Sequence, residues 1–396
     1  MFVCVGTKFI DLMGDADLRF ILVALLFLYL FINKKIMLYI NHGQMAILLV
    51  YLFWCISTSM WSEVPVLSIT KSTFFAFNII TMISAGSLWV TKYGYARNLG
   101  WLYLVLIVSL ISEFFGGGFH QDAGQVALYS GYSANANAFG FLLAISTCCI
   151  LWKIYQHKDN KQLFWIWTTL FISGIYFLFL SYSRSSIVIF VCILCAFFIS
   201  LPLSKKMLIT FSFFFGIVLI LVMMPVSYFE NFLIMHVMKW NTSSALSSEN
   251  VLITRMPLWE KTYQRAIKGG VMGGGFSVTI CQNKHNITGI SSLQHGAEKG
   301  NAQLAIMEET GIIGLVLYVI FLISFFSYII PHYLRLTGSN KVAMGIALGA
   351  IIGLLMESIV EAWWDSVAGP ELICFWTLVG VVHGMIYLEK QKRISK

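Results

Sequence analysis

Long apolar runs constrain this chain more than any other feature. A helix that crosses a lipid bilayer needs roughly 20 mostly apolar residues. Runs of this kind cover about residues 20–32, 44–60, 64–90, 97–115, 137–154, 163–181, 186–203, 207–226, 303–330, 342–362 and 368–388. Residues 1–18 are ambiguous, because three aspartates follow an apolar start. The sequence therefore predicts an all-α polytopic membrane protein with about 11–12 transmembrane helices.

Composition supports this prediction and narrows the classes of function. Only 11% of the 396 residues are charged, whereas soluble domains carry about 25%. This deficit argues against a large soluble core. Six of the eight cysteines lie in apolar runs, where cysteine behaves as a small hydrophobic residue. Cys281 is the only cysteine in the large polar loop, so no disulfide framework is expected.

Charges alternate between successive loops. The basic connections contain Lys34, Lys35, Lys92, Arg97, Lys153, Lys158, Lys161, Lys205, Lys206, Arg335, Lys341 and the C-terminal EKQKRISK. Because cytoplasmic loops collect Lys and Arg, these connections are predicted to be cytoplasmic, and the long loop 227–302 to lie on the outer side. This placement explains most of the +8 net charge without a nucleic-acid partner. We expect one membrane domain over residues 1–396, with loop 227–302 inserted within it.

The longest polar segment runs from Arg255 to Gly314, and we predict that it forms the outer half of an active site. ITRMPLWEKTYQRAI is typical of a helix, with Arg255, Trp259, Thr262 and Ala266 on one face. Glycines at 269–275 end that helix. The glycines 273–275 permit close approach of the backbone to a ligand, and a plain flexible turn is the alternative.

Three arginines are candidates for binding phosphate. Arg184 lies between two spans at the outer membrane boundary, where a cation used only as a topology anchor is not expected. Arg255 and Arg265 lie on the predicted outer helix. An arginine binds phosphate oxygens through two parallel N–H bonds. The alternative for Arg255 and Arg265 is a surface helix with ordinary charges.

Several other polar residues are candidates for the same site. Glu357 lies inside an apolar run, where it serves either an ion pair or catalysis, and Glu309 begins a turn before GIIG. His295 and Glu298 precede the GNAQL helix and are candidate proton acceptors. Asn137 is predicted to be a helix N-cap, with a sugar contact as the alternative. The histidines of the long loop lack metalloprotease spacing, so no metal is expected.

Four segments give the chain a recognisable pattern. They are GYSANANAFG (131–140), SYSRSS (181–186), RMPLWEKTYQRAIKGGVMGGG (255–275) and GNAQLAIMEETGIIG (300–314). In this order, and with this number of spans, the chain resembles the bacterial O-antigen ligase and O-antigen polymerase superfamily. The resemblance covers about residues 131–314 by motif.

The resemblance implies a membrane glycosyltransferase of lipopolysaccharide or polysaccharide biosynthesis. It implies a site at the periplasmic face of the inner membrane, an undecaprenyl-diphosphate-linked glycan as donor, and no cofactor or metal. Arg184 and Arg255 would bind the diphosphate and stabilise its charge as it leaves. Arg265, Asn301, Asn137, Glu309 and Glu357 are further candidates for substrate binding. The lipid bilayer, a chain-length regulator and a flippase are expected partners.

One departure from the family pattern affects the catalytic assignment. Many members carry a histidine directly before the asparagine of the last motif, where this chain has Gly300. Glu298 is our substitute for the general base, and His295 is second. The departure favours a polymerase over a ligase. A transporter or flippase of lipid-linked glycans is a further alternative, for which repeat symmetry and interrupted helices would be expected.

Overall fold

The computed structural model describes residues 17–98, 119–120, 128–129, 136–181, 183–202, 256–279, 299–364, 366–367 and 369–394. Within these ranges the fold is helical apart from one antiparallel pair of two-residue strands, β1 (Phe119–His120) and β2 (Leu128–Tyr129). The helices are α3 (Asp17–Ile32), α4 (His42–Ser57), the 3₁₀-helix η1 (Thr58–Trp61), α5 (Pro65–Asn98), α7 (Ala136–Gln156), α8 (Lys161–Leu180), α9 (Arg184–Ser200), α13 (Met256–Gly269), α14 (Ala302–Leu334), α15 (Gly338–Glu357) and α16 (Pro370–Ile394).

The helices confirm the prediction of an all-α polytopic membrane protein. Among the described residues, seven helices are long and apolar enough to cross a membrane, and α9 and part of α3 are shorter apolar helices. The predicted run 207–226 and nearly all of 97–115 lie outside the described residues. Several boundaries differ from the prediction: α5 extends to Asn98 rather than ending near residue 90, α16 extends to Ile394 rather than ending near 388, and α15 ends at Glu357 rather than near 362. Backbone groups just beyond that end are bonded to another helix, as described below.

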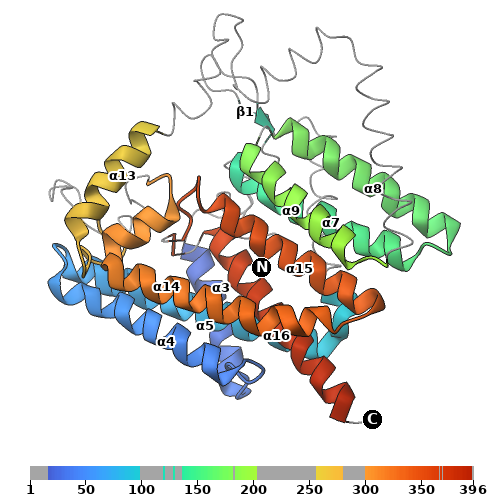
Figure 1. The fold of residues 1–396 in the computed structure, drawn as a ribbon, viewed down its shortest axis with the longest axis horizontal. Helices are drawn as coiled ribbons and strands as arrows, with labels where there is room; N and C mark the ends of the chain where they lie inside the picture. Colours follow the sequence, from blue (N-terminus) through green and yellow to red (C-terminus); the bar gives the residue numbers. More distant parts are fainter. Residues whose placement is uncertain are drawn as a thin grey trace, which may run out of the picture.

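Three helices form the middle of the bundle. Figure 1 shows α14, α15 and α16 between the blue helices α3–α5 on one side and the green helices α7–α9 on the other. Helix α16 packs along α5, and α15 packs along α9. Glycines allow both contacts. A Cβ added to Gly384 of α16 would lie 2.7 Å from the Ser87 carbonyl oxygen of α5. A Cβ added to Gly349 of α15 would lie 2.7 Å from the Ile193 Cα of α9. Close backbone approach through glycine is typical of helices packed within membranes.

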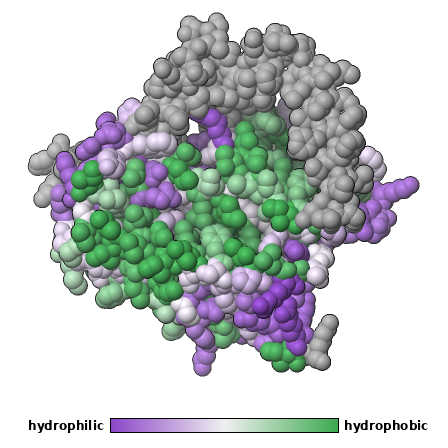
Figure 2. Space-filling view, in the orientation of Figure 1, coloured by the Kyte–Doolittle hydropathy of each residue, from purple (hydrophilic) through white to green (hydrophobic). Residues whose placement is uncertain are grey.

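A broad apolar surface surrounds the bundle. Figure 2 shows it as a continuous green area over the face that carries α4 and α14. Exposed side chains such as Phe53 of α4 and Ile323 of α14 contribute to this apolar surface. An exposed apolar area of this extent marks a membrane-facing surface.

The directions of the helices divide the connections between them into two groups, one at each end of the bundle. One end of the bundle, which we call the site end, contains the starts of α7, α9 and α14 and the end of α15. The candidate residues there are Asn137, Arg184, Asn301 and Glu357, in the same order. The opposite end, which we call the basic end, contains Lys158 after α7, Arg335 after α14, Lys341 at the start of α15 and Arg393 at the end of α16. A hydrogen bond of 3.1 Å from Trp152 to Ser339 joins α7 to α15 there.

Candidate functional site

Helix α13 lies on the first part of α14, and its buried face carries residues that were predicted to share one face. Thr262 and Ala266 are fully buried. The Trp259 indole N–H donates to the Gly300 carbonyl at 2.8 Å, and the Thr262 hydroxyl lies 2.8 Å from the Lys299 carbonyl. These contacts confirm that Trp259, Thr262 and Ala266 share one face, which holds the start of the GNAQL segment in place. Arg255 lies outside the described residues.

The glycine turn after α13 packs against a break in α14. Helix α14 is interrupted at Gly311, whose φ is 72°. The amides of Gly274 and Gly275 donate to the carbonyls of Glu308 and Glu309, both at 2.9 Å. In return, the Ile312 amide donates to the Gly270 carbonyl at 3.2 Å. The turn therefore satisfies backbone groups that the helix break releases, and these glycines serve backbone-to-backbone packing.

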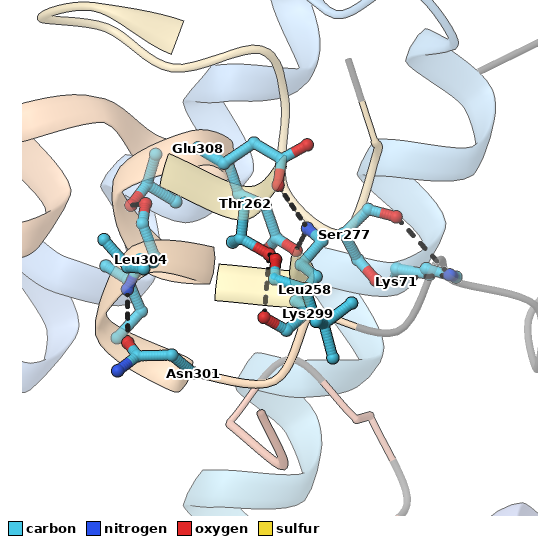
Figure 3. A network of polar contacts seen from close by, with 11 residues as sticks. Lys71, Leu258, Thr262, Ser277, Lys299, Asn301, Leu304 and Glu308 are labelled. Carbon is cyan, nitrogen blue, oxygen red and sulfur yellow. Dashed lines mark hydrogen bonds and ion pairs between the residues drawn. The ribbon is translucent and has the colours of Figure 1, made fainter. Parts of the chain in front are cut away.

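A buried cation lies behind the same break. Lys299, Glu308 and Glu309 are only 2%, 0% and 1% exposed. The Lys299 Nζ lies 3.6 Å from a Glu308 carboxylate oxygen and forms an ion pair with Glu309. Figure 3 shows Lys299 and Glu308 pointing toward each other, with Thr262 beside them. Glu309, a candidate for substrate binding, thus has a structural ion pair with Lys299.

Lys299 was not among the predicted site residues. A signal was present in the sequence, because two adjacent carboxylates in an apolar helix require a cation nearby. Lys299 is ten residues before Glu309 and directly precedes Gly300. The sequence alone did not distinguish it from the other cations of the polar segment, since pairing depends on how α14 begins.

The start of α14 is joined to the end of α15. The Asn301 side-chain oxygen Oδ1 caps α14 by accepting from the Leu304 amide at 2.8 Å, as Figure 3 shows. The Asn301 side-chain amide donates to the Ile359 carbonyl at 2.8 Å. The backbone amide of Ala302 donates to the Ser358 carbonyl at 2.8 Å. Asn301 therefore positions two helix ends, whatever it contacts in a substrate.

Arg184 begins α9, next to a cluster of serine hydroxyl groups. Arg184 is the first residue of α9 and is exposed. The Ser183 and Ser186 hydroxyls lie 2.6 Å apart and are buried. A Cβ added to Gly140 of α7 would lie 2.8 Å from the Ser183 Cβ. The small residues of the first two motifs therefore pack the starts of α7 and α9 together, which places the Arg184 guanidinium at the site end.

Glu357 adds a buried carboxyl group beside this cluster. It is 3% exposed, and the Ser185 side chain hydrogen-bonds to its carboxyl group. Its Oε2 atom has no hydrogen-bond partner among the described residues. The Asn137 side-chain amide donates to a Glu361 carboxylate oxygen at 3.3 Å. Carboxyl groups from the end of α15 thus meet residues from the first two motifs.

The prediction that Asn137 is an N-cap is wrong. Helix α7 begins at Ala136, so Asn137 lies inside the first turn. Its side-chain amide is directed to Glu361, which comes from the connection after α15. A tertiary partner therefore replaces the local one that the sequence suggested.

The remaining candidates are only partly described. Arg265 lies on α13 and is half-buried. Glu298 and His295 lie outside the described residues, as does Arg255. In the described part of the chain, no group of three or more His, Cys, Asp or Glu side chains is arranged to hold a metal ion.

Fold and site define the chain as a multi-pass helical membrane protein with a polar site at one end. Residues 169–319, less than half of the chain, match the family model described as Wzy_C, O-antigen ligase. The matched part includes the SYSRSS, α13 and GNAQL segments. The match confirms the resemblance to the O-antigen polymerase and ligase superfamily. A search of curated proteins finds no match.

Proposed function

We propose that this protein is a glycosyltransferase that polymerises undecaprenyl-diphosphate-linked repeat units of O-antigen or a related polysaccharide. The family match supports an O-antigen polymerase or ligase. The carrying observation is that two motifs far apart in the sequence contact the same short segment after α15, because Asn301 bonds to Ile359 and Asn137 bonds to Glu361. We place the protein in the bacterial inner membrane with the site end facing the periplasm.

In this proposal the acceptor is the sugar hydroxyl of a second lipid-linked unit. Its oxygen attacks the anomeric carbon of the donor sugar and forms a new glycosidic bond. The bond from that carbon to the phosphate oxygen breaks, and undecaprenyl diphosphate leaves with the electron pair. Arg184 and Arg255 stabilise the negative charge that develops on the leaving group, without a metal ion. Glu298, with His295 as the second candidate, accepts the hydroxyl proton.

The other candidates surround this reaction centre. Arg265 on α13 adds positive charge near the diphosphate, and Asn137, Asn301 and Glu357 contact the glycan. Glu309 contributes through its ion pair with Lys299, which supports the helix break in α14. A chain-length regulator and a flippase would act with the enzyme on the same lipid-linked glycans.

The ligase reaction, with lipid A–core as acceptor, is the second candidate, because the matching family is described as O-antigen ligase. The geometry at Gly300 favours the polymerase. Gly300 has a φ of 63°, and a Cβ there would lie 2.6 Å from the Leu258 Cδ2. A histidine at this position, where many relatives carry one, would require a strained left-handed backbone and displacement of the Leu258 side chain.

A transporter is less well supported. The break in α14 at Gly311 is a feature that transporters share. However, backbone groups at this break are bonded to the turn 270–275. The break therefore supports a packed scaffold more than an ion or substrate path.

A lipopolysaccharide gel tests the proposal. A deletion strain carries wild type, Arg184→Ala or Lys158→Ala, and protein abundance in the membrane is measured in parallel. A polymerase predicts single repeat units in the deletion strain and a ladder restored by wild type and Lys158→Ala only. Bare core with polymer on undecaprenyl diphosphate would establish the ligase instead. An unchanged ladder in the deletion strain would overturn both reactions.

A further inference from the structure

A second polar feature lies at the basic end, about 33 residues along α14 from the site end. A pocket of about 130 Å³ lies between the ends of α14 and α16. It is lined by His332, Arg335, Leu336, Ile386, Glu389, Lys390 and Arg393. Figure 2 shows a strongly hydrophilic patch around the end of α16, next to the apolar surface. The pocket is therefore at the boundary between the apolar belt and the polar end.

Charge in this pocket is predominantly positive. Arg335, Lys390 and Arg393 are cations, and Glu389 is the carboxylate among the lining residues. The Asn340 side-chain amide donates to a Glu389 carboxylate oxygen at 2.8 Å, and the Lys392 Nζ lies 3.5 Å from the same oxygen. Glu389 is thus already engaged by groups that do not line the pocket. The negative ends of α14 and α16 offset part of the positive charge, at about half an elementary charge each.

Two further lining groups are held in fixed positions. The Lys390 Nζ donates to the Tyr328 hydroxyl at 3.0 Å, which uses one of its three protons. The His332 Nδ1 lies 2.7 Å from the Tyr328 carbonyl oxygen, which can only accept. Nδ1 therefore carries a proton, and Nε2 is left for a ligand. Leu336 and Ile386 give the same pocket an apolar side.

We propose that this pocket binds a phosphate group, carried either by an anionic phospholipid headgroup or by a soluble phosphate. Two guanidinium groups match phosphate oxygens with paired N–H donors. The volume is well above the roughly 10–15 Å³ that one water needs. Basic pockets between membrane helices on the side rich in Lys and Arg are typical sites for phospholipid headgroups. This inference concerns a site separate from the proposed glycosyl transfer and does not depend on it.

If the cations at the basic end served only to orient the protein in the membrane, their substitution would have different effects than if they bind phosphate. An anchor requires positive charge at the basic end, so any two cations there would be equivalent. A phosphate site requires Arg335 and Arg393 in particular. Lys158 and Lys161 lie at the same end, after α7 and at the start of α8, and do not line the pocket. The pair Lys158→Gln and Lys161→Gln removes the same charge as Arg335→Gln and Arg393→Gln, and is the matched control.

Native mass spectrometry of the full-length protein in detergent tests the proposal. Wild type, the arginine pair and the lysine pair are titrated with phosphatidylglycerol and, separately, with inorganic phosphate. We expect wild type and the lysine pair to bind equally, and the arginine pair to bind at least fivefold more weakly. Binding of phosphatidylglycerol alone assigns a lipid headgroup, and comparable binding of inorganic phosphate assigns a soluble source.

The proposal is overturned if the arginine and lysine pairs bind alike, or if wild type binds neither probe. Thermal unfolding in the same detergent identifies loss of fold in the arginine pair. A second variant, Arg335→Lys with Arg393→Lys, keeps the charge and loses the paired donors. It should bind more tightly than the glutamine pair and more weakly than wild type.

Discussion

Gly311 and Gly273 lie in backbone contact: a Cβ added to Gly311 would come 2.5 Å from the Gly273 amide nitrogen. The first glycine breaks α14, and the second belongs to the turn after α13. Two motifs about 40 residues apart are therefore parts of one interface. Their glycines are required because no side chain fits between the two backbones.

Substitution of Gly311 should destabilise the fold by more than the cost of placing a side chain at a left-handed φ. A left-handed φ costs a residue with a Cβ about 1–2 kcal/mol, and overpacking adds typically 1–3 kcal/mol. Gly338 has a similar φ of 60° with nothing within 4 Å of an added Cβ. We expect Gly311→Ala to lower the unfolding temperature in detergent more than Gly338→Ala does. Equal shifts would show that the contact with Gly273 is unimportant.

Removal of the buried cation should be strongly destabilising. Lys299→Met leaves Glu308 and Glu309 buried without that cation, and breaking a buried ion pair costs about 3–5 kcal/mol. Membrane abundance and thermal unfolding measure the loss. Lys261→Met, at an exposed position of α13, is the control and should be close to wild type.

Neutralising the two carboxylates tests the cause of that loss. Glu308→Gln and Glu309→Gln, added to Lys299→Met, should recover part of the stability, because the charges that Lys299 compensated are then removed as well. A triple variant less stable than Lys299→Met alone would contradict the ion-pair explanation.

Arg184 should affect activity rather than stability. Its side chain is exposed at the start of α9, and a charge-assisted hydrogen bond contributes about 1.5–3 kcal/mol. We expect Arg184→Ala to lower the rate of polymer formation by about 10- to 150-fold at unchanged abundance. Arg184→Lys should retain a fraction of the activity. The rate is measured with purified protein and a lipid-linked repeat unit, and normal turnover by Arg184→Ala would remove this residue from the proposed mechanism.

A histidine at position 300 should not create a better enzyme. The left-handed φ of Gly300 strains the backbone of any residue with a Cβ, and the Leu258 side chain would have to move to admit it. We therefore expect Gly300→His to reduce membrane abundance, with partial recovery when Leu258→Ala is added. A gain of ligase activity in Gly300→His at normal abundance would mean that the position is open to a catalytic histidine.

Sequence reasoning was most successful where one local property decides the structure. The apolar runs at 303–330 and 368–388 predicted α14 and α16 because a membrane-spanning helix satisfies its own backbone and needs only length and apolar side chains. The spacing of Trp259, Thr262 and Ala266 likewise predicted that they share one face of α13, since helical periodicity is local, and the structure shows that this face is buried.

Polar pairing was less predictable from the sequence. Asn137 was expected to cap its own helix, and it bonds to Glu361 instead, 224 residues away. Lys299 was overlooked because several cations in the same segment were equally plausible partners for Glu308 and Glu309. Which polar groups meet depends on the direction in which each helix enters the site end.

The sequence by itself determined the membrane class, most of the described spans and the motifs that resemble those of the superfamily. These follow from hydrophobicity and from residue order, which require no knowledge of distant contacts. Only the tertiary structure decided that Gly273 meets Gly311, that Lys299 neutralises buried carboxylates, and that Asn301 joins α14 to α15. The physical reason is that buried polar groups must find partners, and those partners are set by packing across the whole bundle.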